Sequence, residues 1–225
     1  RATTVGINVL SYPSGAYSNV ILRDFQIDGN SKAAACISFI GSSQGAISSC
    51  FFERITLANA VTYQFYLSNI TYCSLNEVAA SGGQYGLFFS DCYDTSVNDA
   101  LIYNGTQACS LIFKGSQIVF KNSRLFLGDM SAPAILIIDG GTAHTFEDCT
   151  FEPTALNAVT SEVIIKSTGA GTNSVNTDNQ FIRCRFIGLP TTKTSCMDVA
   201  TAGSVYKLKL FQCGFITPTS GFSII

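Results

Sequence analysis

The chain has 225 residues, enough for one large domain, and only 12% of them are charged. Its 13 Lys and Arg against 15 Asp and Glu give a net charge of −2, which argues against a nucleic-acid-binding surface. With 47% hydrophobic residues, including 17 Phe, the composition excludes a disordered chain. No apolar run has the ~18 residues of a membrane-spanning helix, so membrane insertion is not expected. We expect a single domain over residues 1–225, and the start at Arg1 suggests a fragment of a longer protein.

The nine cysteines are spread evenly along the chain and cannot all pair with one another. No CxxC pair is present, and His144 is the single histidine, so neither a metal site nor a cofactor is expected. We interpret the cysteines as small buried hydrophobes made in a reducing cytoplasm. His144 falls beside an inward strand position and is interpreted as structural.

In chain order, short β-branched and aromatic runs alternate with clusters of Gly, Ser, Asn, Asp and Thr, which are typical of turns. No capped helical stretch is found between them. The expected strands lie at 20–27, 36–40, 86–89, 110–113, 134–138, 162–166 and 206–211.

These runs form a repeat. Residues 65–78 align without gaps on residues 87–100, a period of 22, and a shorter pattern extends along the chain. In this pattern a large apolar residue is followed by two polar positions, a small or apolar residue, any residue and another apolar one. Its copies are Leu22-Phe25-Ile27, Ile47-Cys50-Phe52, Leu75-Val78-Ala80, Val97-Ala100-Ile102, Phe120-Ser123-Leu125, Phe146-Cys149-Phe151, Phe181-Cys184-Phe186 and Leu210-Cys213-Phe215.

A repeat this short, without helices, predicts an all-β solenoid, a right-handed parallel β-helix of about eight coils. Equivalent inward residues should then stack in columns about 4.8 Å apart. One column is expected to hold four cysteines and a second column three. The two polar positions should form a corner in which Asn and Asp tolerate the left-handed conformation. The expected thiol columns are Cys50, Cys149, Cys184 and Cys213, and Cys36, Cys109 and Cys196.

The phrase NVILRDFQIDGN at residues 19–30, followed by such coils, resembles the pectate-lyase-like β-helix superfamily, and within it bacteriophage tailspike proteins. The resemblance implies a homotrimer that is part of the virion tail, is made in the bacterial host cytoplasm, and binds and usually cleaves bacterial surface polysaccharide. The superfamily's opening segment and capping helix are missing here.

Acids and tyrosines gather between Arg54 and Lys114, where no Lys or Arg occurs. Carboxyl groups beside aromatic rings suit carbohydrate, and glycoside hydrolysis needs two carboxyl groups. The candidate catalytic residues are Glu77, Asp91, Asp94 and Asp99, and the candidate sugar-binding residues are Tyr63, Tyr66, Tyr85, Tyr93 and Tyr103. Glu77 and Asp99 align one period apart, and Asp91 and Asp94 are expected to converge with them.

Structural interpretations of the same residues stay open. Corner positions of a solenoid are polar for backbone reasons, Asp is a common turn residue, and tyrosines are enriched at subunit interfaces. Several strands read as apolar on both faces, and the outward residues, expected to include Tyr66, Phe88, Ile112 and Leu136, favour coverage by a partner subunit.

Three hypotheses follow. The first is a tailspike-like receptor-binding protein that binds O-antigen or capsule and hydrolyses it as an endo-glycosidase. The second is a non-catalytic trimeric shaft or adhesin segment. The third is a polysaccharide lyase, for which Asp91, Asp94 and Asp99 could hold Ca²⁺, although the stretch without Lys or Arg argues against a lyase base.

Overall fold

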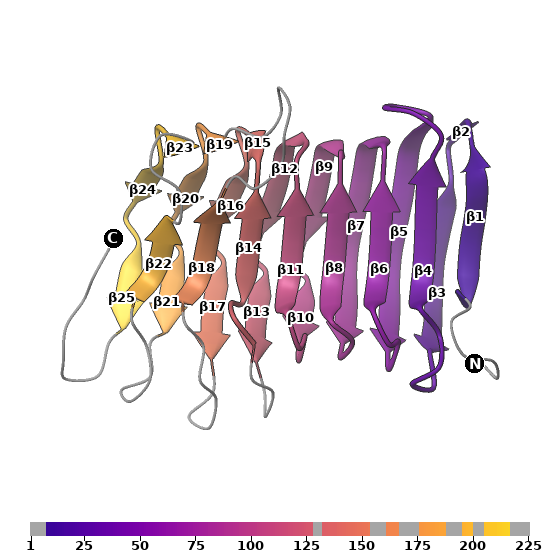
Figure 1. The fold of residues 1–225 in the computed structure, drawn as a ribbon, viewed down its shortest axis with the longest axis horizontal. Coiled ribbons are helices and arrows are strands. Elements are labelled where there is room, and N and C mark those ends of the chain that lie inside the picture. Colours follow the sequence, from indigo (N-terminus) through magenta and orange to yellow (C-terminus); the bar gives the residue numbers. More distant parts are fainter. Residues whose placement is uncertain are drawn as a thin grey trace.

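The computed structural model describes residues 8–127, 132–153, 161–166, 176–187, 195–199 and 205–216. Every regular element in these ranges is a β-strand, and all strand pairs are parallel. The strands stack into an elongated solenoid, with the N-terminal coil at one end and the C-terminal coil at the other (Figure 1). The predicted fold class, a parallel β-helix, is confirmed.

One sheet, which we name the front sheet, takes a single strand from each successive coil and runs in chain order along the solenoid (Figure 1). Its strands are β1 (Leu10–Gly15), β4 (Ala35–Gly41), β6 (Tyr63–Ser68), β8 (Tyr85–Ser90), β11 (Ala108–Phe113), β14 (Leu136–Asp139), β18 (Ser161–Lys166) and β22 (Ser195–Val199).

The other strands form the remaining sides of each coil, and they also pair with the equivalent strands of the coils before and after. They are β2 (Tyr17–Ser18), β3 (Ile21–Asp28), β5 (Ile47–Ala58), β7 (Ile70–Ser81), β9 (Tyr93–Asn98), β10 (Leu101–Tyr103), β12 (Ser116–Lys121), β13 (Arg124–Leu127), β15 (Gly141–Thr142), β16 (Thr145–Glu147), β17 (Thr150–Pro153), β19 (Asn176–Thr177), β20 (Gln180–Ile182), β21 (Arg185–Ile187), β23 (Val205–Tyr206), β24 (Lys209–Phe211) and β25 (Gly214–Ile216).

Each coil turns at residues with positive φ, and these residues stack in columns. Three of the columns matter for the candidate site. Corner 1 follows the front sheet and contains Asn69, Asp91, Lys114 and Gly140; corner 2 contains Asn19, Ser49, Tyr72, Asp94, Gln117, Ala143, Asp178 and Lys207; corner 3 contains Asp24, Arg54, Glu77, Asp99, Asn122, Asp148, Arg183 and Gln212. Asn and Asp recur in all three because their short polar side chains tolerate this conformation. The predicted polar corner is therefore confirmed, and it is corner 3.

Two aromatic ladders fill the C-terminal half of the core. Phe120, Phe146 and Phe181 stack on successive coils with ring centroids 5.2 and 4.7 Å apart. A parallel ladder of Phe151, Phe186 and Phe215 has centroids 5.1 and 4.9 Å apart. Such pairs contribute about 0.5–1.5 kcal/mol each beyond the burial of their area. Because identical rings meet only when the strands are in register, the ladders also fix the register.

The two expected thiol columns differ in outcome. Cys149 stands in register with Cys184 and Cys213, as predicted, because Thr150 pairs with Arg185 and Arg185 with Gly214. The placement of Cys50 in this column is wrong, since Cys50 pairs with Cys73 one corner earlier. Corners 2 and 3 flank similar inward residues, so the pattern fitted Ile47-Cys50-Phe52 although the true copy is Phe52-Ile55-Leu57.

In the second thiol column, Cys36 and Cys109 are buried at equivalent inward positions, and the Cys36 thiol donates to Gln64 Oε1 of the next coil (3.2 Å). Cys196 lies in β22, and its side chain is outside the described part of the structure.

The outward positions of the front sheet differ from the prediction by one residue on two strands. Tyr66 and Phe88 do lie outward, but Ile112 and Leu136 are fully buried in the core. In β11 and β14 the residues in register with Phe88 are Leu111 and Ile137. Residues 111–113 (LIF) and 134–138 (AILII) are apolar at every position, so alternation could not fix which residue faces inward.

Candidate functional site

Glu77 and Asp99 occupy neighbouring positions of corner 3, at the ends of equivalent stretches of β7 and β9. Asn76 pairs with Asn98 in the parallel register, so the next residues of the two strands are adjacent as well. Glu77 has a φ of 51° and Asp99 a φ of 52°, and both side chains are exposed. One strand spacing of about 4.8 Å separates their backbones, as the alignment of residues 65–78 with 87–100 predicts.

The other acids of corner 3 are neutralised by cations from the same column. Asp24 accepts two hydrogen bonds from the Arg54 guanidinium, at 2.6 and 3.1 Å. Asp148 likewise accepts two from Arg183, at 2.8 and 2.7 Å. The hydrogen bonds from the guanidinium groups hold the pKa of both carboxyls below its usual value.

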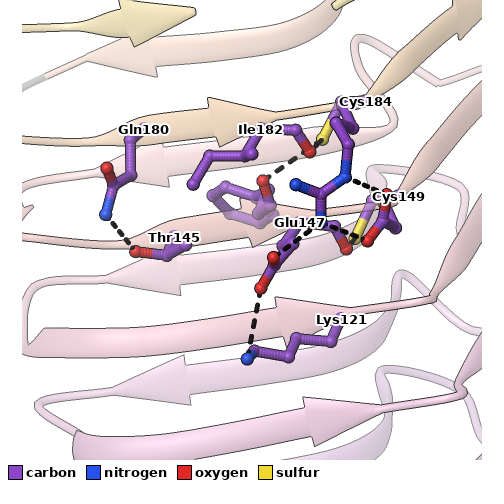
Figure 2. Close-up of polar contacts among 10 residues, drawn as sticks. Lys121, Thr145, Glu147, Cys149, Gln180, Ile182 and Cys184 are labelled. Atoms are coloured by element: carbon purple, nitrogen blue, oxygen red, sulfur yellow. Dashed lines mark hydrogen bonds and ion pairs between the residues drawn. The ribbon is translucent and has the colours of Figure 1, made fainter. Parts of the chain in front are cut away.

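Beside corner 3, Glu147 is also paired: its carboxylate accepts from Arg183 at 2.7 Å and lies 3.1 Å from Lys121 Nζ. Figure 2 shows the Lys121–Glu147 contact bridging two coils. These hydrogen bonds, from Arg183 first and then Lys121, lower the pKa of Glu147. Charge on this part of the solenoid is therefore balanced pair by pair.

Glu77 and Asp99 depart from this arrangement. Within the described residues neither carboxylate has a cationic partner, and the sequence has no Lys or Arg between Arg54 and Lys114. Two like charges on adjacent coils repel each other. A corner needs only a residue that tolerates positive φ, and Asn122 fills the next position of the column without charge. Backbone geometry alone thus does not account for two adjacent unpaired acids.

Asp91 and Asp94 do not converge with this pair. Asp91 lies at corner 1, where it accepts a hydrogen bond from the Ser90 hydroxyl (3.4 Å), and Asp94 lies at corner 2. From Asp94 to Asp99 the chain runs five residues along an extended strand, which spans about 16 Å. In the sequence the two consecutive turns look like one, because the side between corners 1 and 2 is only two residues long.

Among the described residues, no group of three or more His, Cys, Asp or Glu side chains is placed to hold a metal ion. The three acids of the Ca²⁺ hypothesis, Asp91, Asp94 and Asp99, stand at three different corners. The described part also contains no helix that could span a membrane.

The candidate tyrosines lie on three sides of the coil. Tyr63, Tyr66 and Tyr85 gather around Phe88 on the outer surface of the front sheet, with ring centroids 5.0, 5.1 and 5.8 Å from that of Phe88. We call these four residues the aromatic cluster. Burial raises the pKa of Tyr63 and of Tyr85.

Tyr103 stacks on Phe126 of the next coil (5.2 Å) beyond corner 3, and Tyr93 lies on the short side between corners 1 and 2.

The aromatic cluster and the Glu77–Asp99 pair lie on opposite sides of the core. Phe65 of the front sheet packs edge-on against Phe52, with centroids 4.9 Å apart, and Phe52 stands in register with Leu75, two residues before Glu77. A ligand at Glu77 and Asp99 therefore does not contact Tyr63, Tyr66 or Tyr85.

Sequence reasoning missed a polar surface next to the acid pair. Between corners 2 and 3, the outward residues of β7 and β9 are Ser74 and Asn76 on one coil and Ser96 and Asn98 on the next. The Ser96 hydroxyl donates to Ser74 Oγ (3.0 Å), and the Asn98 amide donates to Asn76 Oδ1 (2.8 Å). We call these four residues the amide ladder. The 22-residue alignment already pairs them and could have revealed them.

Comparisons with known proteins are sparse. No family model matches the chain, and no curated protein matches it. Among solved structures it is similar to the A-module of mannuronan C-5 epimerase AlgE4 from Azotobacter vinelandii, with a TM-score of 0.46 and 11% identity over 94% of this chain and 79% of that one. The parallel β-helix is established by the strand register, and the function has to be argued from the residues of this chain.

Proposed function

We propose that this protein is a tailspike-like β-helix that binds bacterial surface polysaccharide, either O-antigen or capsule, and hydrolyses it with Glu77 and Asp99. The observation that carries the proposal is the unpaired state of these two exposed carboxylates, in a corner column whose other acids bind arginine. Their adjacent coils bring two carboxyl groups within reach of one glycosidic bond.

In the proposed reaction one carboxylic acid protonates the glycosidic oxygen, and the other carboxylate acts on the anomeric side. Hydrolysis with retention needs carboxyl groups about 5 Å apart, and inversion needs about 6.5–9.5 Å, to admit a water molecule. Backbones one strand spacing apart support either distance, since side chains at a corner can diverge. The anomeric form of the first product, followed by NMR, distinguishes the two outcomes.

The test is release of reducing ends from a panel of O-antigens and capsules by the parent and by Glu77→Gln and Asp99→Asn. We expect each variant to lose at least ~100-fold in rate, because both carboxyl groups take part in the reaction. Asp148→Asn is the matched control: it removes an exposed carboxylate from the same column at a similar φ of 54°. Equal activity of all four proteins would exclude Glu77 and Asp99 as the acid pair.

One observation favours a second candidate, a trimeric shaft or adhesin segment without catalysis. The aromatic cluster and the aligned Leu111, Ile137 and Ile164 form an apolar band on the front sheet, and Ala108 of this sheet and Ala134, just before β14, belong to the same hydrophobic cluster as Ile137. In a virion tail such a band could face two further copies of the chain. Light scattering after size exclusion gives the oligomeric state. A stable trimer that releases no sugar from any glycan would favour the shaft.

A further inference from the structure

Tyr72, at corner 2, combines two unfavourable features. Its φ is 57°, in the left-handed region that bulky residues avoid, and its side chain is 64% exposed. Three other positions of the same column carry Asn or Asp, which suit this backbone better, and the rest carry Ser, Gln, Ala and Lys, so Tyr72 is the bulkiest and the only aromatic residue among them. An aromatic ring held in water on such a backbone adds little to the core. Conformations of this kind gather at ligand-binding positions.

The amide ladder begins two residues after Tyr72 and presents hydrogen-bonding groups to solvent. Asn76 Oδ1 accepts from both the Ser74 hydroxyl (3.3 Å) and the Asn98 amide (2.8 Å). These bonds fix the two amides in one orientation. Within the described part of the chain they leave the Asn76 N–H groups and the Asn98 carbonyl oxygen available to a ligand. A fixed array of donors and acceptors beside an exposed ring matches the hydroxyls and C–H face of a sugar.

The charges around the ladder disfavour sugars that carry negative charge. On the coil before it, Arg54 is bound by Asp24 and Glu53, and on the coil after it, Lys121 is bound by Glu147. Glu77 and Asp99 follow the ladder at corner 3. Between corners 2 and 3, the cations on the two coils that flank the ladder are therefore engaged, while the two carboxylates are not, and this surface repels a carboxylated or phosphorylated chain.

We propose that Tyr72 and the amide ladder form the binding subsite for a glycan without negative charge, either neutral or amino-bearing. The proposal rests on the proposed function, because it identifies the sugars that Glu77 and Asp99 would cleave. The Tyr72 ring packs on a sugar face, the Asn76 and Asn98 amides bind its hydroxyls, and the carboxylates disfavour uronates.

The experiment measures binding of the whole chain to immobilised bacterial polysaccharides of three classes: neutral, amino-bearing and uronate-bearing. The variants are Tyr72→Gly, Tyr72→Phe and Asn76→Ala. Gln117→Gly is the matched control, since Gln117 is exposed and has a φ of 54° in the same column. Glycine relieves the left-handed backbone at both sites, so neither glycine variant should lower the unfolding midpoint.

We expect the parent to bind only neutral or amino-bearing glycans. Tyr72→Gly and Asn76→Ala should weaken binding at least tenfold, while Tyr72→Phe and Gln117→Gly retain it. Preferential binding of uronate-bearing glycans, or unchanged binding by Tyr72→Gly, would overturn the subsite while leaving the Glu77–Asp99 hydrolase intact. A parent chain that binds no glycan of any class overturns the proposed function and the subsite together.

Discussion

The buried His144 makes the stability of this protein depend on pH between 6.5 and about 4. The imidazole is fully buried, and its Nδ1 accepts a hydrogen bond from the Ile118 backbone N–H (3.3 Å). Burial lowers the pKa of His144 from 6.5 to about 4. Protonation of Nδ1 would also place a second donor against the Ile118 N–H, so the imidazole is neutral in the folded state.

The direction in which the free energy of unfolding changes with pH follows from proton uptake by the unfolded chain. Between pH 6.5 and about 4 the unfolded chain binds a proton that the folded chain does not, so the free energy of unfolding falls as the pH falls. A pKa difference of about 2.5 corresponds to about 3.4 kcal/mol when the transition is complete, of which about 2 kcal/mol is lost between pH 7 and pH 5. The lowered pKa values of Asp24, Glu147 and Asp148 contribute stability that is lost mainly below pH 5, since their ordinary values are 3.8 and 4.5.

Urea unfolding at half-unit pH steps from 4.5 to 7.5 measures this dependence. His144→Gln removes the titrating ring and should flatten the curve above pH 5, whatever its effect on absolute stability. If the parent and His144→Gln lose the same free energy between pH 7 and pH 5, the reasoning about the buried imidazole is wrong.

Two further predictions concern the packing around this ring and the buried thiols. Gly141→Ala should destabilise the fold by about 3 kcal/mol, as measured by urea unfolding. The φ of Gly141 is +105°, and the new Cβ would lie 2.5 Å from His144 Nε2. Gly214→Ala is the control, because no atom lies within 4 Å of the added Cβ at that position. Cys92 and Cys109, whose pKa burial raises to about 12, should resist iodoacetamide at pH 8 until urea unfolds the chain. Peptide mass mapping locates the label, and rapid native modification of either thiol would contradict the buried placement.

The sequence alone was sufficient for the parallel β-helix and for the corner that holds Glu77 and Asp99. Both follow from the coil repeat, since a period of 22 with turn residues at fixed positions leaves little choice of architecture. The register of Cys149 on Cys184 and Cys213 was predictable for the same reason, because equivalent positions of the repeat must stack.

Whether a given side chain points into the core or outward was less predictable from the sequence. The direction of Ile112 could not be read from three consecutive apolar residues, and the side between corners 1 and 2 is so short that Asp94 looks like part of the same turn as Asp91. The separation of the aromatic cluster from the acids depends on which side of the coil each strand forms. Composition carries no information about that. The exposure of Tyr72 likewise became visible only once the coil was closed.

The lengths of the coils have a consequence for how such a protein can diversify. Corner 3 advances 22 residues from Glu77 to Asp99 but 35 from Asp148 to Arg183, and the added sequence falls on both sides of the front strand β18, more of it between β18 and β19 than between β17 and β18. Insertions at either end of a front strand therefore change the chain length without altering the step between stacked corners, which the interstrand hydrogen bonds fix. A lineage with this scaffold can exchange the segments that flank the front strands for new ones, while the rise from each corner to the next stays constant.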